Sequence, residues 1–578
     1  MEIEYQDGTP PRVSRKCITL VAALLLGLGI AQAQTLPGAG DVLKAMPAPV
    51  SKPDSALQIG GGAATARSVA DVEGMKLEIK GFRTVGMTVM TDAELAAAFA
   101  PFIGPDKRFQ ELLDAAAAVK RELAQRGYFL ADVIVPEQKI TNGLVTLQVL
   151  EGHLGKVQLQ IDDGVSLRRS LIESYLSALV EGALIETSVV ERALFQIHDL
   201  RGVAAHSSFV PGAKPGTADL IIKVSASKEF NANIDFDANG SVYTGQHRLS
   251  AGVDGNNLFG QGDLLSVRGT NAVDGDLRFA RVSWLSPIGP WGSKIGGAYT
   301  DLSYRLGTPV FEPLVASGSA YVSSLIGIHP FVRSRNTNFL TILQYDKRQF
   351  HDIQRTTGTE TTKVSHVGSV SFSGDFRDTL GGGGINVYNL AWTSGKLEFG
   401  TAAQTAADAV GRKTAGRFEK VNLSASRLQA IVDRLALYLS YSQQFGNKNY
   451  DASEKFSLGG PSAVRAYPQG EGAGDEGYFG TLELRYRLPF EESFPGTMVI
   501  TAFHDFGRST LIKRPTGADL AAKSPLIRRI SGSGVGLNWE VADDWYMRTS
   551  LAYRDTGDAT ADHLSRNPRL YFQFSKFF

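Results

Sequence analysis

The sequence contains almost no cysteine. Its 578 residues include a single one, Cys17, which lies at the start of an apolar run near the N-terminus. Disulfides, zinc–thiolate sites, iron–sulfur clusters and thiol catalysis are therefore excluded from the rest of the chain.

Net charge and long apolar runs are also missing. Lys+Arg and Asp+Glu both number 59, and no basic block is present. The charge distribution thus gives no indication of a nucleic-acid partner. No window beyond the N-terminal run holds 18 consecutive apolar residues, which excludes a transmembrane helix. If the mature chain lies in a membrane, only a closed β-barrel also satisfies its backbone hydrogen bonds there.

The N-terminus has the features of a secretory signal peptide. Basic "RVSRK" (12–16) precedes apolar "CITLVAALLLGLGI" (17–30), and "AQA" (31–33) supplies small residues before the expected cleavage site. An uncleaved anchor is the alternative, but the run of about 14 apolar residues is shorter than the roughly 20 that span a bilayer. We therefore expect residues 1–33 to be removed. The acidic stretch "MEIEYQD" (1–7) before the basic region is unusual for a signal peptide, so the true start codon stays open.

Residues 34–74 are rich in Pro, Gly, Ala and Ser and are predicted to form a linker. Within them, only "GDVLKAM" (40–46) has a pattern compatible with one short helix.

Residues 75–227 contain one α+β pattern twice, each time in the order β-α-α-β-β. In the first copy, Thr91 and Glu94 have capping-box spacing at a helix start, and Asn142-Gly143 predicts a tight turn between the last two strands. The first copy comprises a strand (75–82), helices (91–102 and 108–126) and strands (128–138 and 143–152). The second comprises a strand (153–162), helices (166–179 and 187–202) and strands (203–211 and 218–227).

From about residue 228 onward the chain alternates between apolar and polar residues with period two. "TLELRYRL" (481–488) places leucines and a tyrosine on one face and Glu483 and Arg485 on the other. A half-exposed soluble sheet would show the same alternation. Full charges on the polar faces, aromatic residues at the ends of the apolar faces and the C-terminal strand "RLYFQFSKFF" favour an outer-membrane barrel. About 9–11 residues per strand plus loops predict roughly 14–18 strands.

Signatures of catalysis and of cofactor binding are missing. The nine histidines are scattered, and no HExxH, GxSxG or Walker lysine pattern occurs. The run "LGGGG" (380–384) is better explained as a turn between strands. We expect no enzymatic activity, no metal, no nucleotide and no cofactor.

A single constellation of charged residues stands out. Arg465 lies in the glycine-rich loop "GGPSAVRAYPQGEGAGDEGY" (459–478), and Asp505 ends "FHD" in a strand whose lumen face also carries Phe503. The fixed fork of an arginine suits a carboxylate. The alternative, two ordinary solvated charges, is at least as compatible with the spacing alone.

Several motifs of the chain together resemble those of a known family, the two-partner-secretion transporters of the Omp85 superfamily. "LGGPSAVRAYPQGEGAGDEGYFGTLELRY" resembles their VRGY-containing loop, and "FHD" resembles their F/G-x-D strand motif. "RGYFLADVIVPEQKITNGLVTLQVLEGHLGKVQL" is similar to the end of their first POTRA domain, and "GNNLFGQGDLL" to their early barrel hairpin. The resemblance extends from about residue 75 to the C-terminus. It departs at Ala466, which replaces the glycine of VRGY.

The resemblance implies two periplasmic POTRA domains (75–152 and 153–227) followed by an outer-membrane antiparallel β-barrel of sixteen strands (228–578). It implies export of one large β-rich exoprotein that carries an N-terminal secretion domain, and insertion into outer-membrane lipid by the barrel assembly machinery. The residues expected at the contact between loop and barrel are Arg465, Tyr467, Phe503 and Asp505.

For substrate capture we expect the strand edge near Phe129, Ala131, Val133 and Val135, beside the helix at 108–126. An outer-membrane assembly insertase of the same superfamily and a passive porin are the alternatives. The segment before the first POTRA domain looks too broken for a long plug helix. The exported partner (an adhesin, a cytolysin, a contact-dependent toxin or a haem-related protein) and the oligomeric state stay open.

Overall fold

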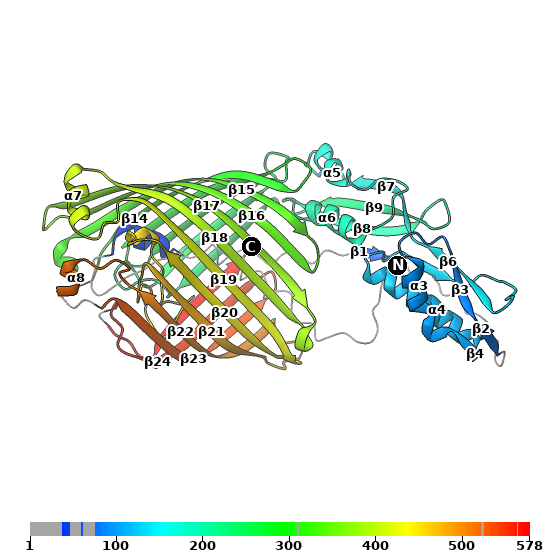
Figure 1. Cartoon of the computed structure of the whole chain (residues 1–578). Helices are drawn as coiled ribbons and strands as arrows, with labels where there is room; N and C mark the ends of the chain where they lie inside the picture. Colours follow the sequence, from blue (N-terminus) through cyan, green and yellow to red (C-terminus); the bar gives the residue numbers. More distant parts are fainter. Residues whose placement is uncertain are drawn as a thin grey trace. The chain divides into compact units, whose positions relative to one another are not determined.

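The computed structural model describes residues 37–46, 59–61, 76–308, 311–491, 493–521, 525–562 and 564–578. The predicted signal peptide and most of the predicted linker lie outside these residues. The chain forms two compact units (Figure 1). Of the described residues, the first unit contains 59–61, 76–227 and 333–335, and the second contains 37–46 together with the rest of the chain from residue 228 onward.

The first unit begins with a small α+β domain. Its elements are β2 (Leu77–Ile79), β3 (Gly81–Val85), α3 (Asp92–Phe99), β4 (Gly104–Lys107), α4 (Phe109–Gln125), β5 (Asp132–Ile134) and β6 (Leu144–Leu150). One sheet has the order β3-β6-β5, and β2 pairs with β4. Leu112, Val119 and Leu123 of α4 pack with Val145 and Leu147 of β6 in a buried core.

Local sequence signals place the helices of this domain. Thr91 caps α3, because its side chain accepts a hydrogen bond from the Glu94 backbone, and the Glu94 carboxylate accepts from the Thr91 backbone. The guanidinium of Arg126 donates to Glu94 (2.8 Å) and lowers the pKa of that carboxyl group to about 2. The capping-box prediction is therefore confirmed.

Two strand predictions in this domain are wrong in extent. The expected strand 75–82 is divided into β2 and β3, and the expected strand 128–138 is reduced to the three residues of β5. Pro136 has no N–H to donate to a ladder, which disfavours continuation of β5. Phe129 lies outside β5 and packs against the core of the following domain, with its ring centroid 5.5 Å from that of Phe209.

The second domain has the predicted order β-α-α-β-β, with β7 (His153–Ile161), α5 (Arg169–Leu176), α6 (Thr187–His198), β8 (Val203–Pro211) and β9 (Thr217–Ala226), whereas in the first domain β4 lies between the two helices. Its sheet has the order β1-β8-β9-β7. The extra strand β1 (Ile59–Gly61) comes from the predicted linker and pairs in parallel with residues 207–209. The linker thus covers part of the β8 edge, which the sequence did not predict.

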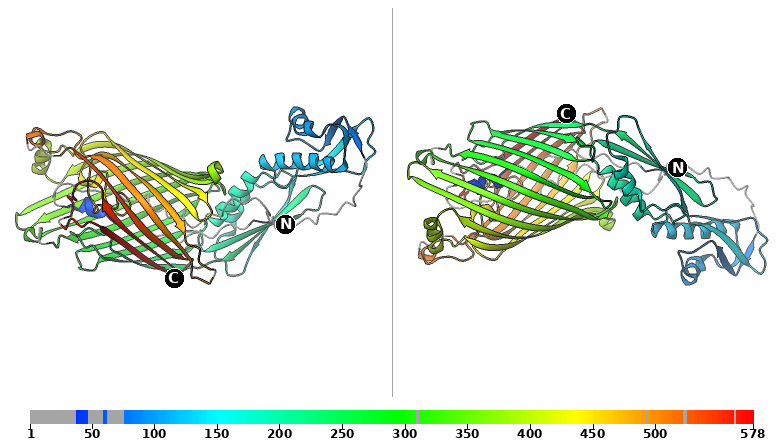
Figure 2. Two further views of the ribbon diagram at one scale, coloured as in Figure 1. Left: turned by 90° about the horizontal axis from the view of Figure 1, so that it is seen from below. Right: turned by 90° about the horizontal axis from the view of Figure 1, so that it is seen from above.

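The second unit is a closed barrel of sixteen strands, so the predicted strand number is confirmed (Figures 1 and 2). The strands are β10 (Phe230–Asp237), β11 (Arg248–Asn256), β12 (Leu264–Ala272), β13 (Leu277–Ile288), β14 (Ser293–Arg305), β15 (Ala316–Arg333), β16 (Thr337–Gln354), β17 (Thr359–Asp378), β18 (Gly384–Phe399), β19 (Gly416–Val432), β20 (Leu435–Gly446), β21 (Glu476–Arg487), β22 (Thr497–Thr510), β23 (Ile527–Val541), β24 (Trp545–Arg554) and β25 (Arg569–Phe577). Antiparallel pairing of β25 with β10 closes the ring.

The two faces of the barrel strands differ as the alternation predicts. On β21, Leu482 and Leu484 are 46% and 48% exposed, whereas Glu483 between them is 4% exposed. The apolar face therefore points outward and the charged face points into the lumen. Among the described residues, no helix combines the length and apolar character needed to cross a membrane.

Candidate functional site in the barrel lumen

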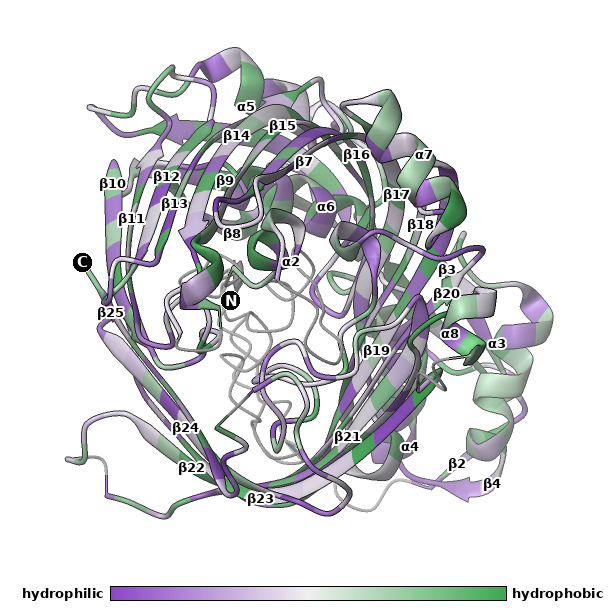
Figure 3. Cartoon of the chain, turned by 90° about the vertical axis from the view of Figure 1, so that its left-hand side faces the viewer, coloured by the Kyte–Doolittle hydropathy of each residue, from purple (hydrophilic) through white to green (hydrophobic). Residues whose placement is uncertain are grey.

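The chain between β20 and β21, residues 447–475, folds back inside the barrel; we call it the lumen loop. Viewed along the barrel, irregular segments occupy the space within the ring of strands (Figure 3). Val464 and Tyr467 are fully buried and pack with Phe479, Phe503 and Ile530 on the inner wall. The predicted loop 459–478 is therefore part of a longer one, and its last residues already belong to β21.

Arg465 is clamped to Asp505 on β22. Its Nε lies 2.8 Å from Asp505 Oδ2, its Nη2 lies 2.8 Å from Oδ1, and its backbone N–H donates to Oδ2 at 3.1 Å. The guanidinium carbon lies 3.3 Å from the centroid of the Phe503 ring. The structure thus brings together the three residues Arg465, Phe503 and Asp505, and the pairing has the bidentate geometry that favours arginine over lysine.

Glu483 is a further partner that the sequence-based site did not include. Its Oε2 accepts from Arg465 Nη1 at 2.6 Å, and its Oε1 accepts from Arg485 Nε at 2.8 Å. Burial alone would lower the pKa of Arg465, but its hydrogen bonds to Asp505 and Glu483 raise that pKa above its ordinary value. The only signal for Glu483 was its place on the lumen face of "TLELRYRL".

Tyr467 joins the lumen loop to the C-terminal part of the barrel. Its hydroxyl lies 3.2 Å from the carbonyl oxygen of Gly557 and 3.3 Å from Thr556 Oγ1. Its own carbonyl accepts a hydrogen bond from the hydroxyl of Tyr571 on β25, at 2.8 Å. The predicted loop–barrel residue therefore contacts the wall at a place different from the Arg465 clamp.

The unexpected Ala466 is accommodated by a glycine on the facing strand. Ala466 is buried, and a Cβ at Gly532 of β23 would lie 2.2 Å from the Ala466 Cβ. Two side chains cannot occupy that space. The methyl group of Ala466 therefore fits only because residue 532 is a glycine and has no side chain.

A short helix also lies in the lumen, as the views in Figures 1 and 3 agree. It is α2 (Ala39–Lys44), which forms where "GDVLKAM" was compatible with a helix. The segment before the first POTRA domain looked too broken for a long plug helix, and the helix described in it, α2, has six residues and lies in the lumen. Val42 packs with Tyr304 and Phe350, among other barrel residues.

Most polar contacts of α2 involve main-chain groups, either those of the helix itself and Ala45 after it or those of the lumen loop. Lys44 Nζ donates to the carbonyls of Ala452 (3.0 Å) and Lys455 (2.9 Å) in the lumen loop. Asp352 Oδ1 accepts from the Ala39 N–H at 2.7 Å. The Ala45 carbonyl accepts from Arg248 at 2.9 Å and from Gln469 at 3.3 Å. The helix is therefore fixed to the wall and to the lumen loop together.

The residues predicted for substrate capture are placed differently from the expectation. Ala131 and Val133 are only 2% and 8% exposed and belong to the core of the first domain, and Val135 packs against that core. Phe129 packs into the second domain. Ala131 and Val133 cannot bind a substrate directly, because folding buries them, and Phe129 and Val135 are partly buried against the domain cores. The strand edge of β5 and the 40% exposed Ile134 are what remains available there.

Within the described part of the chain, no group of three or more His, Cys, Asp or Glu residues is arranged to hold a metal ion.

Two tandem β-α-α-β-β domains, a closed barrel of sixteen strands and a loop arginine clamped in the lumen define the architecture of an Omp85-type outer-membrane transporter. A family model described as "Haemolysin secretion/activation protein ShlB/FhaC/HecB" matches residues 216–539, and one described as "POTRA domain, ShlB-type" matches residues 77–152. The chain belongs to the ShlB/FhaC/HecB family of haemolysin secretion/activation proteins, which are two-partner-secretion transporters of the outer membrane. Its POTRA domains accordingly lie in the periplasm.

Individual relatives agree with this placement. The heme/hemopexin transporter protein HuxB of Haemophilus influenzae is 25% identical over 485 residues, which cover 83% of this chain and 84% of HuxB. The outer membrane transporter CdiB of Dickeya dadantii is 23% identical over 371 residues, which cover 63% of this chain and 64% of that CdiB. Among solved structures, CdiB from Escherichia coli has a TM-score of 0.64 at 20% identity, covering 89% of this chain and 93% of that one. BamA from Haemophilus ducreyi, lacking POTRA domains 1–3, has a TM-score of 0.52 at 15% identity, covering 87% and 100%.

Replacing Arg465 with Gln should destabilise docking of the lumen loop by about 3–5 kcal/mol, because it leaves Asp505 buried without its cation. Asp505→Asn should cost less, since Arg465 then keeps Glu483. The measurement is the temperature at which the folded barrel loses its distinct mobility in a denaturing gel. Arg487→Gln, on the same strand as Glu483, is the control. The ion pair of Arg487 with Asp433 is long (3.5 Å) and exposed, so the expected effect is at most about 1 kcal/mol. Equal shifts for Arg465→Gln and Arg487→Gln would refute the clamp.

Proposed function

We propose that this transporter exports one large, β-rich exoprotein as an extended chain through the barrel lumen, after its POTRA domains have captured the secretion domain of that exoprotein. The observation that carries this proposal is the presence of two segments inside the closed barrel, the lumen loop and α2, that are held by different kinds of contact. A passive porin has no need for such an arrangement or for POTRA domains. No nucleotide motif is present in the sequence, so folding of the exoprotein outside the cell supplies the direction of transport.

Capture uses the backbone edge of β5 rather than the side chains of Phe129, Ala131, Val133 and Val135. β5 is the outer strand of the β3-β6-β5 sheet, so its unpaired side can accept an extended peptide by strand addition. Ile134 is exposed on this strand and offers an apolar contact beside the edge. The edge of β8 in the second domain is less open, because β1 already covers part of it.

Opening of the path requires α2 to leave while the lumen loop stays. Arg465 holds the lumen loop by a bidentate ion pair with a fully buried aspartate and a second pair with Glu483. The contacts of α2 are single hydrogen bonds, several of them to carbonyls, and such bonds are weaker than paired charges. The helix is therefore the segment that can be displaced at lower cost.

An assembly insertase of the same superfamily is the alternative function, since the BamA barrel has a similar fold. The matching family models and relatives favour secretion. One relative is named for heme and hemopexin, whereas the other is named only as an outer membrane transporter, so the cargo of this chain is to be found by experiment.

Deletion of the gene for this chain should remove one large protein from the culture medium and leave the profile of assembled outer-membrane proteins unchanged. Quantitative proteomics of medium and outer membrane measures both effects, and complementation with the intact gene is the control. General loss of barrel proteins from the outer membrane would instead support the insertase.

Replacing Ile134 with Asp should weaken binding of the secretion domain of that exoprotein about tenfold, because a charge would be placed at an apolar contact. Binding to the purified transporter can be measured by biolayer interferometry. Val180→Asp is the matched control, since Val180 is also exposed (60%) but lies in the second domain. Equal affinities for the Ile134 and Val180 variants would contradict capture at β5.

Replacing Gly40 with Val should expel α2 from the lumen, because a Cβ at Gly40 would lie 2.8 Å from the Ser453 Cβ. The expected result is a larger ion conductance of the transporter in planar bilayers. Gly517→Val serves as the control, because nothing lies within 4 Å of a Cβ at that position. Unchanged conductance of a well-assembled Gly40 variant would show that α2 does not limit the path.

A further inference from the structure

Glu471 is a fully buried carboxylate in the returning part of the lumen loop. Its Oε1 accepts from Arg528 Nε (2.9 Å), Arg528 Nη2 (2.6 Å) and Thr560 Oγ1 (2.8 Å). Its Oε2 accepts from the backbone N–H groups of Thr560 (2.7 Å) and Ala561 (2.9 Å). Five donors converge on one carboxylate at distances of 2.6–2.9 Å, the range typical of charge-assisted hydrogen bonds. Its neighbours in "QGEGAG" gave no sign of this role.

The partners of Glu471 lie on different elements from the partners of Arg465. Arg528 is on β23, and Thr560 and Ala561 belong to residues 555–568, which connect β24 to β25 and are called the anchor loop here. Arg465 instead binds Glu483 on β21 and Asp505 on β22. The attachments of Arg465 and Glu471 to the wall therefore share no strand. The outgoing arm of the lumen loop is held elsewhere, by ion pairs of Asp451 with Lys363 and of Glu454 with Arg348 and Lys420.

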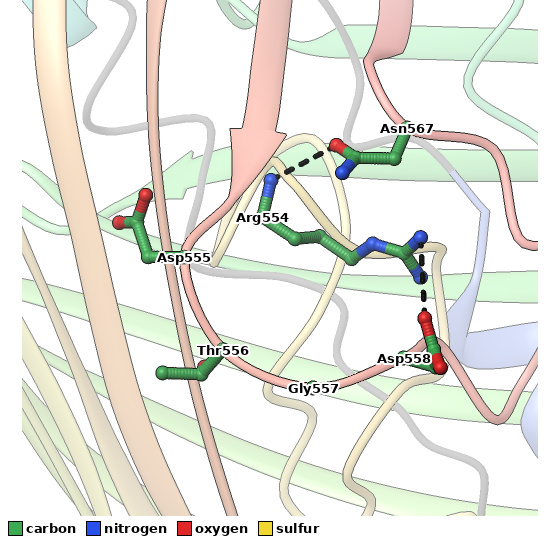
Figure 4. A pocket seen from close by; sticks show the side chains of 6 residues that line it. All are labelled: Arg554, Asp555, Thr556, Gly557, Asp558 and Asn567. Atoms are coloured by element: carbon green, nitrogen blue, oxygen red, sulfur yellow. Dashed lines mark hydrogen bonds and ion pairs between the residues drawn. The ribbon is translucent and has the colours of Figure 1, made fainter.

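The anchor loop is itself held firmly. Asp562 and Arg569 form a buried ion pair at 2.7 Å. The Arg554 backbone N–H donates to Asn567 Oδ1 at 3.1 Å, and the Arg554 guanidinium lies 3.6 Å from Asp558, on the rim of an open pocket of about 210 Å³ (Figure 4). Arg528 also donates to the Asp558 carbonyl. Glu471 thus binds to a fixed part of the barrel.

These attachments lie at the extracellular end of the barrel. The second POTRA domain runs directly into β10, so the first residue of β10 marks the periplasmic end. Successive strands reverse direction, which places the β20–β21 and β24–β25 connections at the opposite end. This is where the exported chain leaves the lumen.

We propose that Glu471 is a positioning residue for export: it forms a second clamp that fixes the returning arm of the lumen loop to β23 and the anchor loop, independently of Arg465, and so sets the width of the exit. The part of this proposal that concerns the exit rests on the proposed function. A carboxylate is required, because both oxygens accept and Arg528 supplies a positive charge. Glutamine offers one accepting oxygen and presents an NH₂ group to donors, whereas aspartate keeps the charge.

The position of the lumen loop can be measured directly by spin labelling. Cys17 is the only cysteine and lies in the predicted signal peptide, so a Cys17→Ser chain accepts labels at chosen sites without interference. Exposed Ser462 in the lumen loop and exposed Leu564 in the anchor loop are replaced by cysteine. Pulsed electron resonance then gives the distribution of distances between the two labels in lipid vesicles.

Glu471→Gln should increase the population of displaced loops about tenfold, the factor that corresponds to the loss of one charge-assisted hydrogen bond. Glu471→Asp should restore a narrower distribution. Glu476→Gln is the matched control, because Glu476 pairs with Lys513 at the same end of the barrel but is about one-third exposed. Combination of Glu471→Gln with Arg465→Gln should displace more loops than either substitution alone.

A distribution unchanged by Glu471→Gln in folded barrels would overturn the clamp, and so would a double variant no worse than Arg465→Gln. The role in export is tested separately by secretion from cells. Displaced loops together with unchanged secretion would overturn the role of Glu471 as a positioning residue for export. The distance measurement needs no exoprotein, so it reads the clamp even if the proposed function itself fails.

Discussion

The placement of the central part of the lumen loop depends on one largely buried cation. Arg465 is removed from bulk water, and two carboxylates on adjacent strands, Asp505 and Glu483, surround its guanidinium while Phe503 covers one face. An arginine buried without such partners would be strongly destabilising. Arg465 therefore favours the register of the lumen loop that places its guanidinium between these residues. The burial of Val464 and Tyr467 follows from that placement.

Small residues on the wall make room for this loop. Gly532 leaves the space that Ala466 occupies, so the departure from the VRGY pattern is matched by a change in shape on the opposite strand. A closed barrel offers no strand edge along its wall, and its width is set by strand number and tilt. Segments within the lumen, rather than the wall, are thus the natural means of controlling passage. α2 and the lumen loop differ in this respect, since one is held by single hydrogen bonds and the other by paired charges.

The POTRA domains leave few apolar side chains free to bind a partner. Small domains need most of their apolar side chains for their own cores, and Ala131, Val133 and Phe129 are all used in this way. What is left for an extended partner is backbone at sheet edges. One edge, that of β8, already carries a short strand of this same chain, which contains two glycines and offers few side chains for packing.

Much of this molecule was predictable from its sequence. Period-two alternation determined which face of each barrel strand meets lipid, because successive side chains of a strand point to opposite sides. The capping box of Thr91 and Glu94 and the repeated β-α-α-β-β order are local patterns in the same sense. The link between Arg465 and Asp505 was open on spacing alone, and it was the resemblance to a family that favoured it.

Tertiary structure alone decided the rest. Glu483 and Glu471 look like ordinary charges in the sequence, and only the folded barrel buries each of them against an arginine. The six residues of α2 are too few to form a stable helix in isolation, and their place in the lumen comes from contacts with distant strands. Phe129 resembles a residue of an exposed strand until the second domain packs against it. Each of these cases depends on contacts between residues far apart in the chain, which no local pattern encodes.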